Sequence, residues 1–312
     1  MTRKKQQVLV TGSSGYLGSH LADSLDEAGY EVILFDKTPS KYKRSSQKEV
    51  IGDILDREKI IEASKGCKYV FHFAAQADID SSSENVSKTI QSNILGTLNI
   101  LEAAKKNNVD RIIFASSIYV YSDLGSFYRV SKQTCEKLIE EYEREYSVNY
   151  TILRYGSLYG PRANEFNSIS KILTEALSSK KITRRGNGEE IREYIHVKDA
   201  AALSIKAIQK KFKNKHLIIT GNQQIKVKDL LLIIKEILNN KIKINYIDVK
   251  DFHHYKITPF SYKPTLAERL VPETFHDLGQ GILDMVYSIE EKNSLQKDTK
   301  KVSLTKRKKK KV

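Results

Sequence analysis

A short apolar run leads directly into a glycine-rich turn near the start of the chain. Residues 8–10 read Val-Leu-Val, Thr11 follows, and glycines lie at positions 12, 15 and 18 before an amphipathic stretch over residues 19–28. This order predicts a strand over residues 7–11, a tight turn and a helix. Because the first N–H groups of a helix are unpaired and carry a partial positive charge, such a turn favours a bound phosphate. Glycines let the backbone approach that phosphate closely.

A second apolar run ends in an acidic residue. Residues 31–36 read Glu-Val-Ile-Leu-Phe-Asp, so Asp36 lies 18 residues after Gly18. A carboxylate at the end of the second strand of such a unit can accept both hydroxyl groups of an adenosine ribose. Strand, glycines, helix, strand and acid in this order predict a dinucleotide site. The alternative is a glycine-rich turn that only packs a helix against a strand.

Length and composition restrict the class of protein. The 312 residues, of which 40% are hydrophobic, allow a large core and about two domains. No run reaches the ~18–20 apolar residues of a membrane span, and the apolar run after the basic residues 1–7 is too short for an export signal. Cys67 and Cys135 are the two cysteines, and they lack metal-ligand spacing. We therefore expect a cytoplasmic protein with free thiols and no metal site, with a disulfide between the two as the alternative.

The end of the chain holds most of the excess positive charge. Residues 292–312 carry ten Lys or Arg and one acid, so they contribute +9 to the net charge of +15. Almost none of these residues is apolar, which predicts a disordered tail. A solvated chain end is the simpler interpretation, and contact with nucleic acid, anionic lipid or another acidic partner is the alternative. The tail has no aromatic residue, so stacking on bases is not indicated.

Strands and helices alternate through the first half of the chain. Strands separated by helices pair in parallel through right-handed crossovers, so residues 1–160 predict an α/β fold with a doubly wound parallel sheet of the Rossmann type. Strands are expected over residues 7–11, 31–36, 49–51, 69–73, 111–115 and 149–153, and helices over residues 57–65, 84–107 and 128–146.

The second half alternates less regularly and contains no internal repeat. Helices are expected over residues 168–179, 197–211, 227–238 and 275–289, and strands over residues 217–220 and 242–249. This pattern predicts a smaller, mixed α/β part over residues 161–291 that mainly binds the substrate, with later segments returning to the first domain.

Two segments of the first half can supply acid–base chemistry. The strand over residues 111–115 runs into Ser116 and Ser117, at the edge where an open α/β sheet presents ligand-binding groups. Eleven residues later, Tyr128 and Lys132 occupy positions i and i+4, on one face of a helix. A tyrosine that acts as a base near neutral pH needs its pKa lowered by about three units. The Lys132 ammonium and an oxidised nicotinamide, both positive, can supply this shift, and Ser117 can donate to the same substrate oxygen.

The Tyr-x-x-x-Lys spacing also occurs at Tyr194 with Lys198 and at Tyr246 with Lys250. In those places, two exposed residues one helical turn apart, or coincidence, are sufficient explanations. The pair in the first half of the chain is preferred because it follows a serine at the end of a central strand.

Several motifs together resemble one enzyme superfamily, the extended short-chain dehydrogenases/reductases. Within it, the chain is similar to the nucleotide-sugar epimerases and dehydratases related to UDP-galactose 4-epimerase, over about residues 6–290. The motifs are residues 11–18 (Thr-Gly-Ser-Ser-Gly-Tyr-Leu-Gly), Ser116-Ser117, Tyr128 with Lys132, and residues 52–54 (Gly-Asp-Ile), 71–76 (Phe-His-Phe-Ala-Ala-Gln), 93–97 (Asn-Ile-Leu-Gly-Thr), 153–155 (Leu-Arg-Tyr), 159–162 (Tyr-Gly-Pro-Arg) and 191–199 (Ile-Arg-Glu-Tyr-Ile-His-Val-Lys-Asp).

The resemblance implies a set of contacts for NAD. The glycine turn would line the pyrophosphate, and Asp36 would hold the adenine ribose, which favours NAD over NADP because a 2′-phosphate would meet the carboxylate charge. Asp53 and Ile54 would flank the adenine, and residues 73–76 would lie beneath the nicotinamide half. The cofactor-binding residues carried over are Gly12, Ser14, Gly15, Tyr16, Leu17, Gly18, Asp36, Lys37, Asp53, Ile54, Phe73, Ala74, Ala75, Gln76, Asn93, Tyr128, Lys132 and Tyr155.

The resemblance also implies substrate contacts at Ser117, Ser157 and Arg192. Arg192 matches an arginine that grips the diphosphate of a nucleotide sugar, a task suited to the planar fork of donors on a guanidinium. A surface ion pair with a neighbouring Glu is the alternative for Arg192. His196 in the same motif is interpreted as structural.

The implied activity is that of an NAD-dependent epimerase acting on a nucleotide-diphosphate sugar through a transient 4-keto intermediate. Catalysis would rest on Ser117, Tyr128 and Lys132, with Tyr128 taking the proton of a sugar hydroxyl and returning it after the keto sugar turns. Relatives that remove water or carbon dioxide carry Asp or Glu just after the catalytic Ser, whereas Ile118 and Tyr119 stand here. An NAD(P)H-dependent reductase or dehydratase of a keto sugar and a non-catalytic dinucleotide-binding scaffold are the alternatives.

Two departures from the family pattern concern the sugar site. The segment between Ser117 and Tyr128 is shorter than is usual in the family, which implies a more open pocket, and Ser157 stands where many relatives have Asn. The resemblance further favours a homodimer, formed through the helices expected at 84–107 and 128–146.

Overall fold

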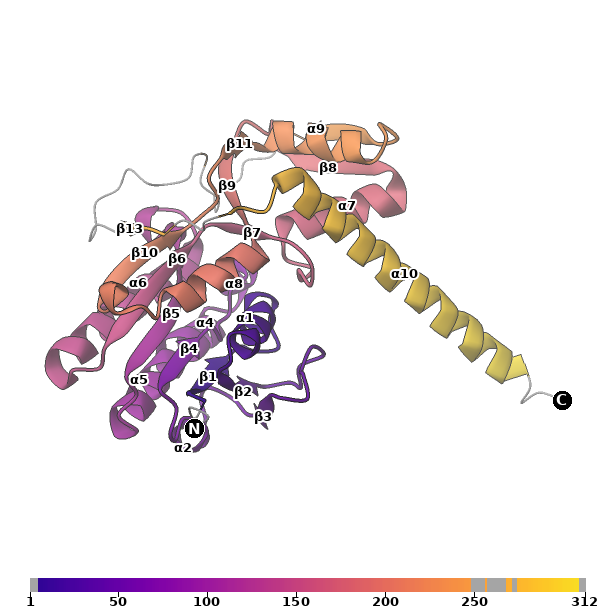
Figure 1. Ribbon diagram of the computed structural model, residues 1–312. Coiled ribbons are helices and arrows are strands. Elements are labelled where there is room, and N and C mark those ends of the chain that lie inside the picture. The colour runs from indigo at the N-terminus through magenta and orange to yellow at the C-terminus, as the bar shows by residue number, and fades with distance from the viewer. Residues whose placement is uncertain (1–4, 248–255, 257–267, 271–273, 309–312) are drawn as a thin grey trace.

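The computed structural model describes residues 5–247, 256, 268–270 and 274–308 (Figure 1). An eight-stranded sheet runs through its centre, and all neighbouring strands in it are parallel. In their order across the sheet, the strands are β13 (Glu268–Arg269), β10 (Lys215–Ile219), β6 (Tyr150–Tyr155), β5 (Arg111–Ser117), β4 (Tyr69–His72), β1 (Gln7–Thr11), β2 (Glu31–Asp36) and β3 (Lys48–Ile51). The predicted doubly wound parallel sheet is confirmed.

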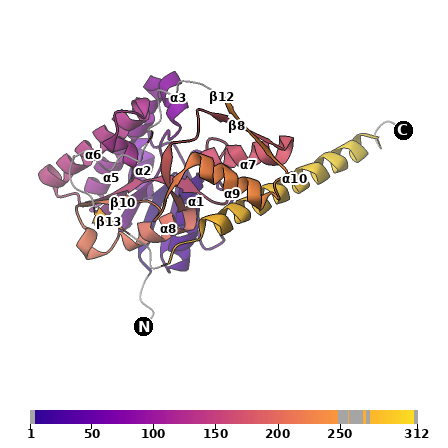
Figure 2. The ribbon, with the colours of Figure 1, turned by 90° about the horizontal axis from the view of Figure 1, so that it is seen from above.

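The apolar run of β1 is buried on both sides of the sheet. Val8 and Val10 belong to the core on one face, and Leu9 belongs to the core on the other. Because successive side chains of a strand point to opposite faces, a strand between two helix layers needs a continuous apolar run. The first face is covered by α1 (Tyr16–Glu27) and α8 (Val197–Lys206), and the second by α2 (Arg57–Ala63), α5 (Gly96–Lys106) and α6 (Ser126–Tyr146) (Figures 1 and 2).

The strand order reverses beside β1, which fixes where a ligand can bind. The chain proceeds from β1 outward to β2 and β3, then returns to the other side of β1 with β4. Loops that leave β1 and β4 therefore run in opposite directions and open a crevice at the carboxyl ends of the two strands. The glycine turn follows β1 and lies at this crevice.

The second half of the chain builds a smaller part with two further sheets (Figures 1 and 2). Its helices and the start of α10 enclose a separate buried cluster. The elements are the sheet of β11 (Gln224–Lys226), β9 (Ile191–His196) and β7 (Ser157–Tyr159), the pair β12 (Lys243–Ile247) and β8 (Lys181–Arg185), and the helices α7 (Ser168–Ser179) and α9 (Val227–Ile237). Residues 248 and 249 of the predicted strand 242–249 lie outside the described residues. The chain also returns to the central sheet as β10 and β13, whereas the division into domains near residue 160 stays a prediction.

The single helix expected over residues 84–107 is wrong, because the structure divides it. Asn85 ends one short helix and begins the next, with its side chain accepting the N–H of Lys88. A π-helical turn then separates that helix from α5. The segments are α3 (Ile79–Glu84), α4 (Val86–Ile90), η1 (Gln91–Leu95) and α5. Asn favours helix ends over interiors because its side chain bonds to nearby backbone groups, and this explains the break.

The basic segment at the end of the chain continues the last helix, and its disorder stays a prediction. The last helix, α10 (Leu278–Lys308), continues through most of the basic segment and extends away from the body of the molecule (Figures 1 and 2). Its first turns are anchored by Ile282, Met285 and Val286, which are buried. No Gly or Pro follows Gly281, and Lys, Arg, Leu and Gln are good helix formers, so nothing in the sequence ends the helix early. Residues 309–312 lie outside the described part.

Candidate active site

A cavity of about 520 Å³ lies at the carboxyl ends of the central strands. It is lined by most of the residues predicted from the sequence, which confirms that the chain brings the glycine turn and the Tyr-Lys pair together. The predicted residues on its wall are Gly12, Gly15, Tyr16, Leu17, Gly18, Asp36, Lys37, Ile54, Phe73, Ala74, Ala75, Gln76, Ser117, Tyr128, Lys132 and Tyr155. The predicted residues that do not line it are Ser14, Asp53, Asn93, Ser157 and Arg192.

The glycine turn has room for backbone only. Gly12 adopts φ of 70°, and a Cβ placed on it would lie 2.6 Å from the backbone nitrogen of Ala74. A Cβ on Gly18 would lie 2.0 Å from the carbonyl oxygen of Gly12. Gly15 is the residue before α1 and has no side chain, so no side chain caps the first N–H groups of the helix. A backbone cradle at a helix amino end fits the pyrophosphate of a dinucleotide.

Two charged groups define the far end of the cavity, beyond the glycine turn. The Asp36 carboxylate accepts the backbone N–H of Ser14 at 3.0 Å, which ties the end of β2 to the turn. Lys37 forms an ion pair with Asp53 at 2.9 Å, and this pair is about half exposed. Asp53 does not line the cavity itself but pairs with Lys37, which does. Its neighbour Ile54 lines the cavity directly.

Ser117, Tyr128 and Lys132 meet on one wall of the cavity. Ser117 ends β5, and its hydroxyl is hydrogen-bonded to the Tyr128 hydroxyl. The Lys132 ammonium donates to the carbonyl oxygen of Ala115 at 2.7 Å and lies 5.7 Å from the centre of the Tyr128 ring. The i, i+4 spacing on α6 thus places both groups beside the end of β5, as predicted.

Burial opposes ionisation of both groups. It raises the pKa of Tyr128 to about 12, although the hydrogen bond from Ser117 stabilises the phenolate and acts in the other direction. Burial also lowers the pKa of Lys132 to about 8. The Lys132 charge alone therefore does not produce the lowered tyrosine pKa that the sequence argument required, so a phenolate near neutral pH depends on further positive charge in the cavity.

Asn93 lies behind the cavity wall and positions its lining. Its side-chain oxygen accepts the N–H of Gln76 at 2.7 Å, and its amide nitrogen donates to the Gln76 carbonyl at 3.1 Å and to Ser131 at 2.9 Å. It stands on the π-helical turn η1, a distortion that is frequent at functional sites. Asn93 thus links the loop after β4 to α6, instead of lining the cavity as a cofactor-binding residue.

A buried ion pair, not selected from the sequence, supports the same wall. Arg154 on β6 binds Glu136 of α6 through two hydrogen bonds of 3.0 and 2.6 Å, and it donates to the Tyr121 hydroxyl at 2.6 Å. Glu136 also accepts from Ser116 at 2.5 Å. Breaking such a pair by removing one partner leaves a buried charge and is strongly destabilising. Arg154 was part of a matched motif, whereas Glu136 has no signal of its own among the charged residues of α6.

Two of the three predicted substrate residues, Ser157 and Arg192, lie away from the cavity wall, which Ser117 lines. Arg192 on β9 is nine-tenths buried and donates to the backbone carbonyls of Ile191 at 2.9 Å and Lys256 at 3.4 Å. Ser157 is at the start of β7 and does not line the cavity. The substrate roles of both residues stay predictions.

His196, interpreted as structural, caps α8 by accepting from the N–H of Lys198 at 3.4 Å.

Sequence reasoning did not select several residues of the wall. Phe35 and Gly52 adjoin Asp36 and Asp53 in sequence, so their position at strand ends was the available signal. Lys88 and Asn164 come from α4 and from the loop after β7, and no motif marks them. The full set of unselected wall residues is Phe35, Gly52, Ala77, Lys88, Ser92, Ala115, Ser116, Gly156, Leu158 and Asn164.

Buried histidines near and behind the site predict a loss of stability in acid. Burial lowers the pKa of His72 and His196 to about 3 and that of His20 to about 4. The folded protein keeps these imidazoles neutral at pH 5, whereas the unfolded chain binds protons near pH 6.5. The free energy of unfolding should therefore fall by about 1.6 kcal/mol per imidazole between pH 6.5 and pH 5. Urea titrations at the two pH values measure this fall.

The matched variant for this prediction is His72→Gln, because glutamine stays uncharged at both pH values. His72 bridges Thr11 and Thr97 through contacts of 2.8 and 2.9 Å, so the variant also loses stability at pH 6.5. The predicted signature is a smaller difference between the two pH values in the variant. An equal difference in both proteins would contradict the assignment of the acid loss to His72.

Comparisons with known proteins agree with this geometry. The model of the NAD dependent epimerase/dehydratase family matches residues 8–220. A protein of Methanocaldococcus jannaschii with the provisional name UDP-glucose 4-epimerase is 31% identical over 92% of this chain and 99% of its own. The UDP-glucose 4-epimerase of Thermotoga maritima, solved with UDP-glucose, has a TM-score of 0.81 at 26% identity, covering 92% of this chain and 99% of its own. The UDP-glucuronic acid 4-epimerase of Bacillus cereus, solved with UDP-glucuronic acid and NAD, shares the fold with a TM-score of 0.80 at 22% identity, over 92% and 99% of the two chains.

Proposed function

We propose that this chain, which belongs to the NAD dependent epimerase/dehydratase family, is an NAD-dependent epimerase of a nucleotide-diphosphate sugar that works through a transient 4-keto intermediate. The observation that carries the proposal is the meeting of Ser117, Tyr128 and Lys132 on the wall of the cavity that the glycine turn also lines. The turn supplies the cradle for the cofactor pyrophosphate, and the trio supplies acid–base chemistry beside it. The named relatives act on UDP-sugars, which favours a UDP-sugar as the substrate here.

The chain's own groups account for the proton transfers. Tyr128 accepts the proton of a sugar hydroxyl and later returns it, because its hydroxyl lies with Ser117 and Lys132 on the cavity wall. Ser117 donates to the same oxygen and stabilises negative charge as it develops. Lys132 is held in place by the Ala115 carbonyl and contributes positive charge 5.7 Å from the Tyr128 ring. The bound NAD supplies reversible hydride exchange at the sugar carbon.

Asp36 supports NAD over NADP. Its carboxylate stands at the end of β2 on the cavity wall and is held by the Ser14 N–H. It can accept two ribose hydroxyls, and its charge would repel a 2′-phosphate. Lys37, the adjacent cation, is engaged by Asp53.

The cavity wall supports an epimerase over a dehydratase. Ile118 is buried, and no carboxylate besides Asp36 is among the described residues that line the cavity. Removal of water from a keto sugar needs an acid and a base near the carbon that loses the hydroxyl. An epimerase needs only the groups already present, because its proton returns to the oxygen from which it came.

The experiment is a turnover assay with purified protein, a trace of NAD, and a panel of UDP-, dTDP-, GDP- and CDP-sugars followed by proton NMR. We expect one pair of sugars differing at C4 to interconvert to equilibrium from either side without net consumption of cofactor. A requirement for stoichiometric NADH or NADPH would instead assign a reductase. Tight NAD binding without turnover of any sugar in the panel would favour the non-catalytic scaffold.

We also propose a homodimer formed over α4, η1 and α6. These three elements contact one another, and they expose Ile90, Leu95, Phe127 and Val130. Burying large apolar side chains is the main favourable term in association. The double variant Leu95→Glu/Val130→Glu should convert a dimer into a monomer, as measured by light scattering coupled to size exclusion. The control is Leu232→Glu, because Leu232 is equally exposed on the distant helix α9 and should leave the dimer intact.

Two further properties are proposed. Both cysteines are buried free thiols, which supports a cytoplasmic location with its reducing conditions. Among the described residues, no helix has the length and apolar character that crossing a membrane requires.

The basic segment 292–312 supports contact with an acidic partner. Deleting it should abolish such binding and leave turnover unchanged, and a loss of turnover would assign the segment to the enzyme itself.

A further inference from the structure

Three successive turns of α6 hold the end of β5. The first two contacts are those of Tyr128 and Lys132 with the last residues of this strand. The third comes from Glu136, one turn beyond Lys132, whose carboxylate accepts the hydroxyl of Ser116 at 2.5 Å. Because residues four apart share one face of a helix, the three contacts form a continuous seam between α6 and the end of β5.

Both oxygens of the Glu136 carboxylate are engaged. Oε1 accepts from Ser116 and from Nε of Arg154 at 3.0 Å, and Oε2 accepts from Nη2 of Arg154 at 2.6 Å. All three residues are buried. Turning the carboxylate away would leave a buried guanidinium without its partner, which is costly. Glu136 is therefore held in one orientation, and it ties α6 to β5 and β6 at once.

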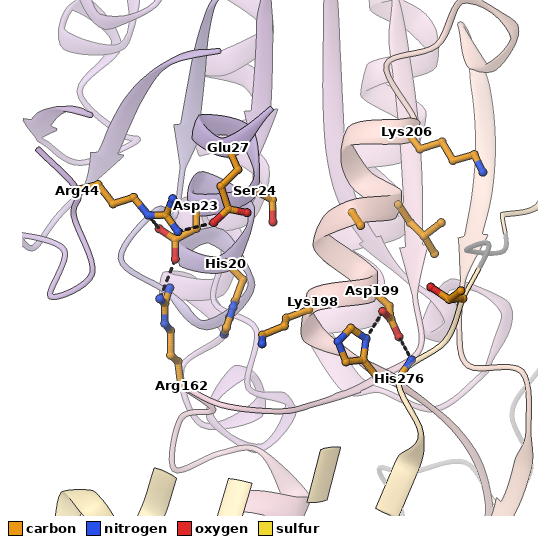
Figure 3. A pocket seen from close by; sticks show the side chains of 13 residues that line it. His20, Asp23, Ser24, Glu27, Arg44, Arg162, Lys198, Asp199, Lys206 and His276 are labelled. Atoms are coloured by element: carbon orange, nitrogen blue, oxygen red, sulfur yellow. Dashed lines mark hydrogen bonds and ion pairs between the residues drawn. The ribbon is translucent and has the colours of Figure 1, made fainter. Parts of the chain in front are cut away.

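The pair of Glu136 and Arg154 is more enclosed than a second linked set of charges on the other face of the sheet. In that set, Asp23 bonds to Arg44 at 3.1 Å and to Arg162 at 2.7 Å, and the three residues line a cavity of about 690 Å³ between α1 and α8 (Figure 3). A space of this size holds water, which screens charges. Glu136 and Arg154 line neither this cavity nor the candidate active site, so the charge of the carboxylate acts on its neighbours through protein.

The neighbour that most needs this charge is Lys132. Its ammonium is buried beside the carbonyl oxygen of Ala115 and lies 4.7 Å from the centre of the Phe114 ring. Burial lowers the pKa of Lys132 to about 8, and Cys135 and Glu136 of the same helix act in the opposite direction. Burial raises the pKa of the Cys135 thiol, so the thiol keeps its proton near neutral pH. Glu136 is then the one of the two that carries a full negative charge.

Three other ionisable groups lie around Lys132 and Glu136, and none of them is negative near neutral pH. His72 on β4 stays neutral, because burial lowers its pKa to about 3. Tyr128 keeps its proton, because burial raises its pKa to about 12. Arg154 on β6 is positive and is bonded to the Glu136 carboxylate. The carboxylate that balances Lys132 is thus the same one that fixes the strand to which Lys132 is bonded.

We propose that Glu136 is a positioning residue of the proposed epimerase, which fastens the end of β5 to α6 and supplies the negative charge that balances the buried Lys132 ammonium. This inference rests on the proposed function, because the cavity wall gains its catalytic role there. Glu136 does not line the cavity, so it acts on the reaction through Ser116 and Lys132. A neutral Lys132 would add no positive charge beside Tyr128, and proton transfer would weaken as the pH rises.

The charge is tested with the double variant Glu136→Gln/Arg154→Gln, because removing one partner alone would leave a buried charge. Glutamine can still accept the Ser116 hydroxyl, so the fastening contact is kept. Lysine labelled with carbon-13 at Cε reports each ionisation by NMR, and the Lys132 signal is the one missing from Lys132→Gln. We expect the pKa of Lys132 to be lower by about 0.5 to 1 in the double variant. The ratio of variant to wild-type kcat should then fall by about two- to fivefold between pH 6 and pH 8.

The control is Glu141→Gln/Arg144→Gln, which removes a pair of opposite charges from the same helix. This pair is exposed, with 2.8 Å between its atoms, and its loss should change neither the pKa of Lys132 nor the kcat ratio. The fastening contact is tested with Ser116→Ala, which keeps the buried ion pair. We expect kcat to fall by about tenfold at both pH values, because a small misplacement of reacting groups is costly, and the pKa of Lys132 to stay unchanged.

Each part of the proposal can be overturned separately. An unchanged pKa of Lys132 in a folded double variant contradicts the charge role, and so does a kcat ratio that is equal at pH 6 and pH 8. Wild-type kcat in Ser116→Ala contradicts the fastening role, and this variant decides if the melting temperature shows that the double variant does not fold. The NMR titration needs no substrate. Absence of turnover in the wild type would therefore contradict the proposed function, while the titration still decides whether Glu136 sets the charge of Lys132.

Discussion

Replacing Tyr128 with Phe is expected to lower kcat by about a hundredfold to ten-thousandfold, the usual contribution of a positioned general acid or base. The change removes one hydroxyl and keeps the ring that lines the cavity, so the Kd for NADH, measured by fluorescence, should stay within a few fold. The Tyr128 hydroxyl is buried and bonded to Ser117. The other two tyrosines that line the cavity are bonded elsewhere, Tyr155 to Ser204 and Tyr16 to the Gly160 carbonyl.

The matched control for this variant is Tyr146→Phe. Tyr146 lies on the same helix, α6, but near its carboxyl end, and it is exposed. Its replacement should leave both kcat and cofactor binding unchanged. A Tyr128→Phe protein with full turnover would show that proton transfer uses another group, and a loss of NADH binding of the same size would show that the hydroxyl serves binding instead of chemistry.

Replacing Gly18 with Ala is expected to have the second largest effect, on cofactor affinity. The added Cβ would lie 2.0 Å from the Gly12 carbonyl oxygen, a distance that forces the turn to move away from α1. Overpacking of this kind costs about 2–3 kcal/mol, which corresponds to a loss of about 30- to 150-fold if the cost falls on the cofactor-binding conformation. Fluorescence titration with NADH measures the affinity, and urea unfolding measures any shared loss of stability.

Gly29→Ala provides the comparison for this second prediction. Gly29 lies just after the carboxyl end of α1, the helix that contains Gly18, with φ of 85°, and a Cβ on it would meet nothing within 4 Å. The change should cost about 1 kcal/mol of backbone strain and leave NADH affinity unchanged. If both variants lost affinity equally, the effect would come from general destabilisation and not from the shape of the glycine turn.

The parts of the fold that sequence reasoning found are those with a local physical cause. Val8, Leu9 and Val10 predict a strand of the parallel sheet, and the structure divides their side chains between two cores. The glycines at 12 and 18 predict close backbone approach, and a Cβ has no room at either. Tyr128 and Lys132 predict a shared helix face, and both line one cavity.

The features that sequence reasoning missed depend on long-range partners. β8 pairs with β12 across about sixty residues, and Lys181 to Arg185 carry too much charge to read as a strand without that partner. Arg192 matches a family motif, yet its guanidinium bonds to the carbonyls of Ile191 and Lys256, which no local pattern reveals. Glu136 is one acid among several on α6, and only its contact with Arg154 distinguishes it.

The most direct test of the central claim follows an isotope at the carbon whose configuration inverts. A nucleotide sugar from the interconverting pair is labelled with deuterium at C4 and incubated with the protein in ordinary water, and the product is examined by NMR. In the proposed mechanism, Tyr128 moves only the hydroxyl proton, and the hydrogen on C4 is passed to the bound cofactor and back within one site. The account therefore predicts that the deuterium stays at C4 of the product. Loss of the deuterium to water would mean that a base removes the proton from carbon directly, and it would contradict the account.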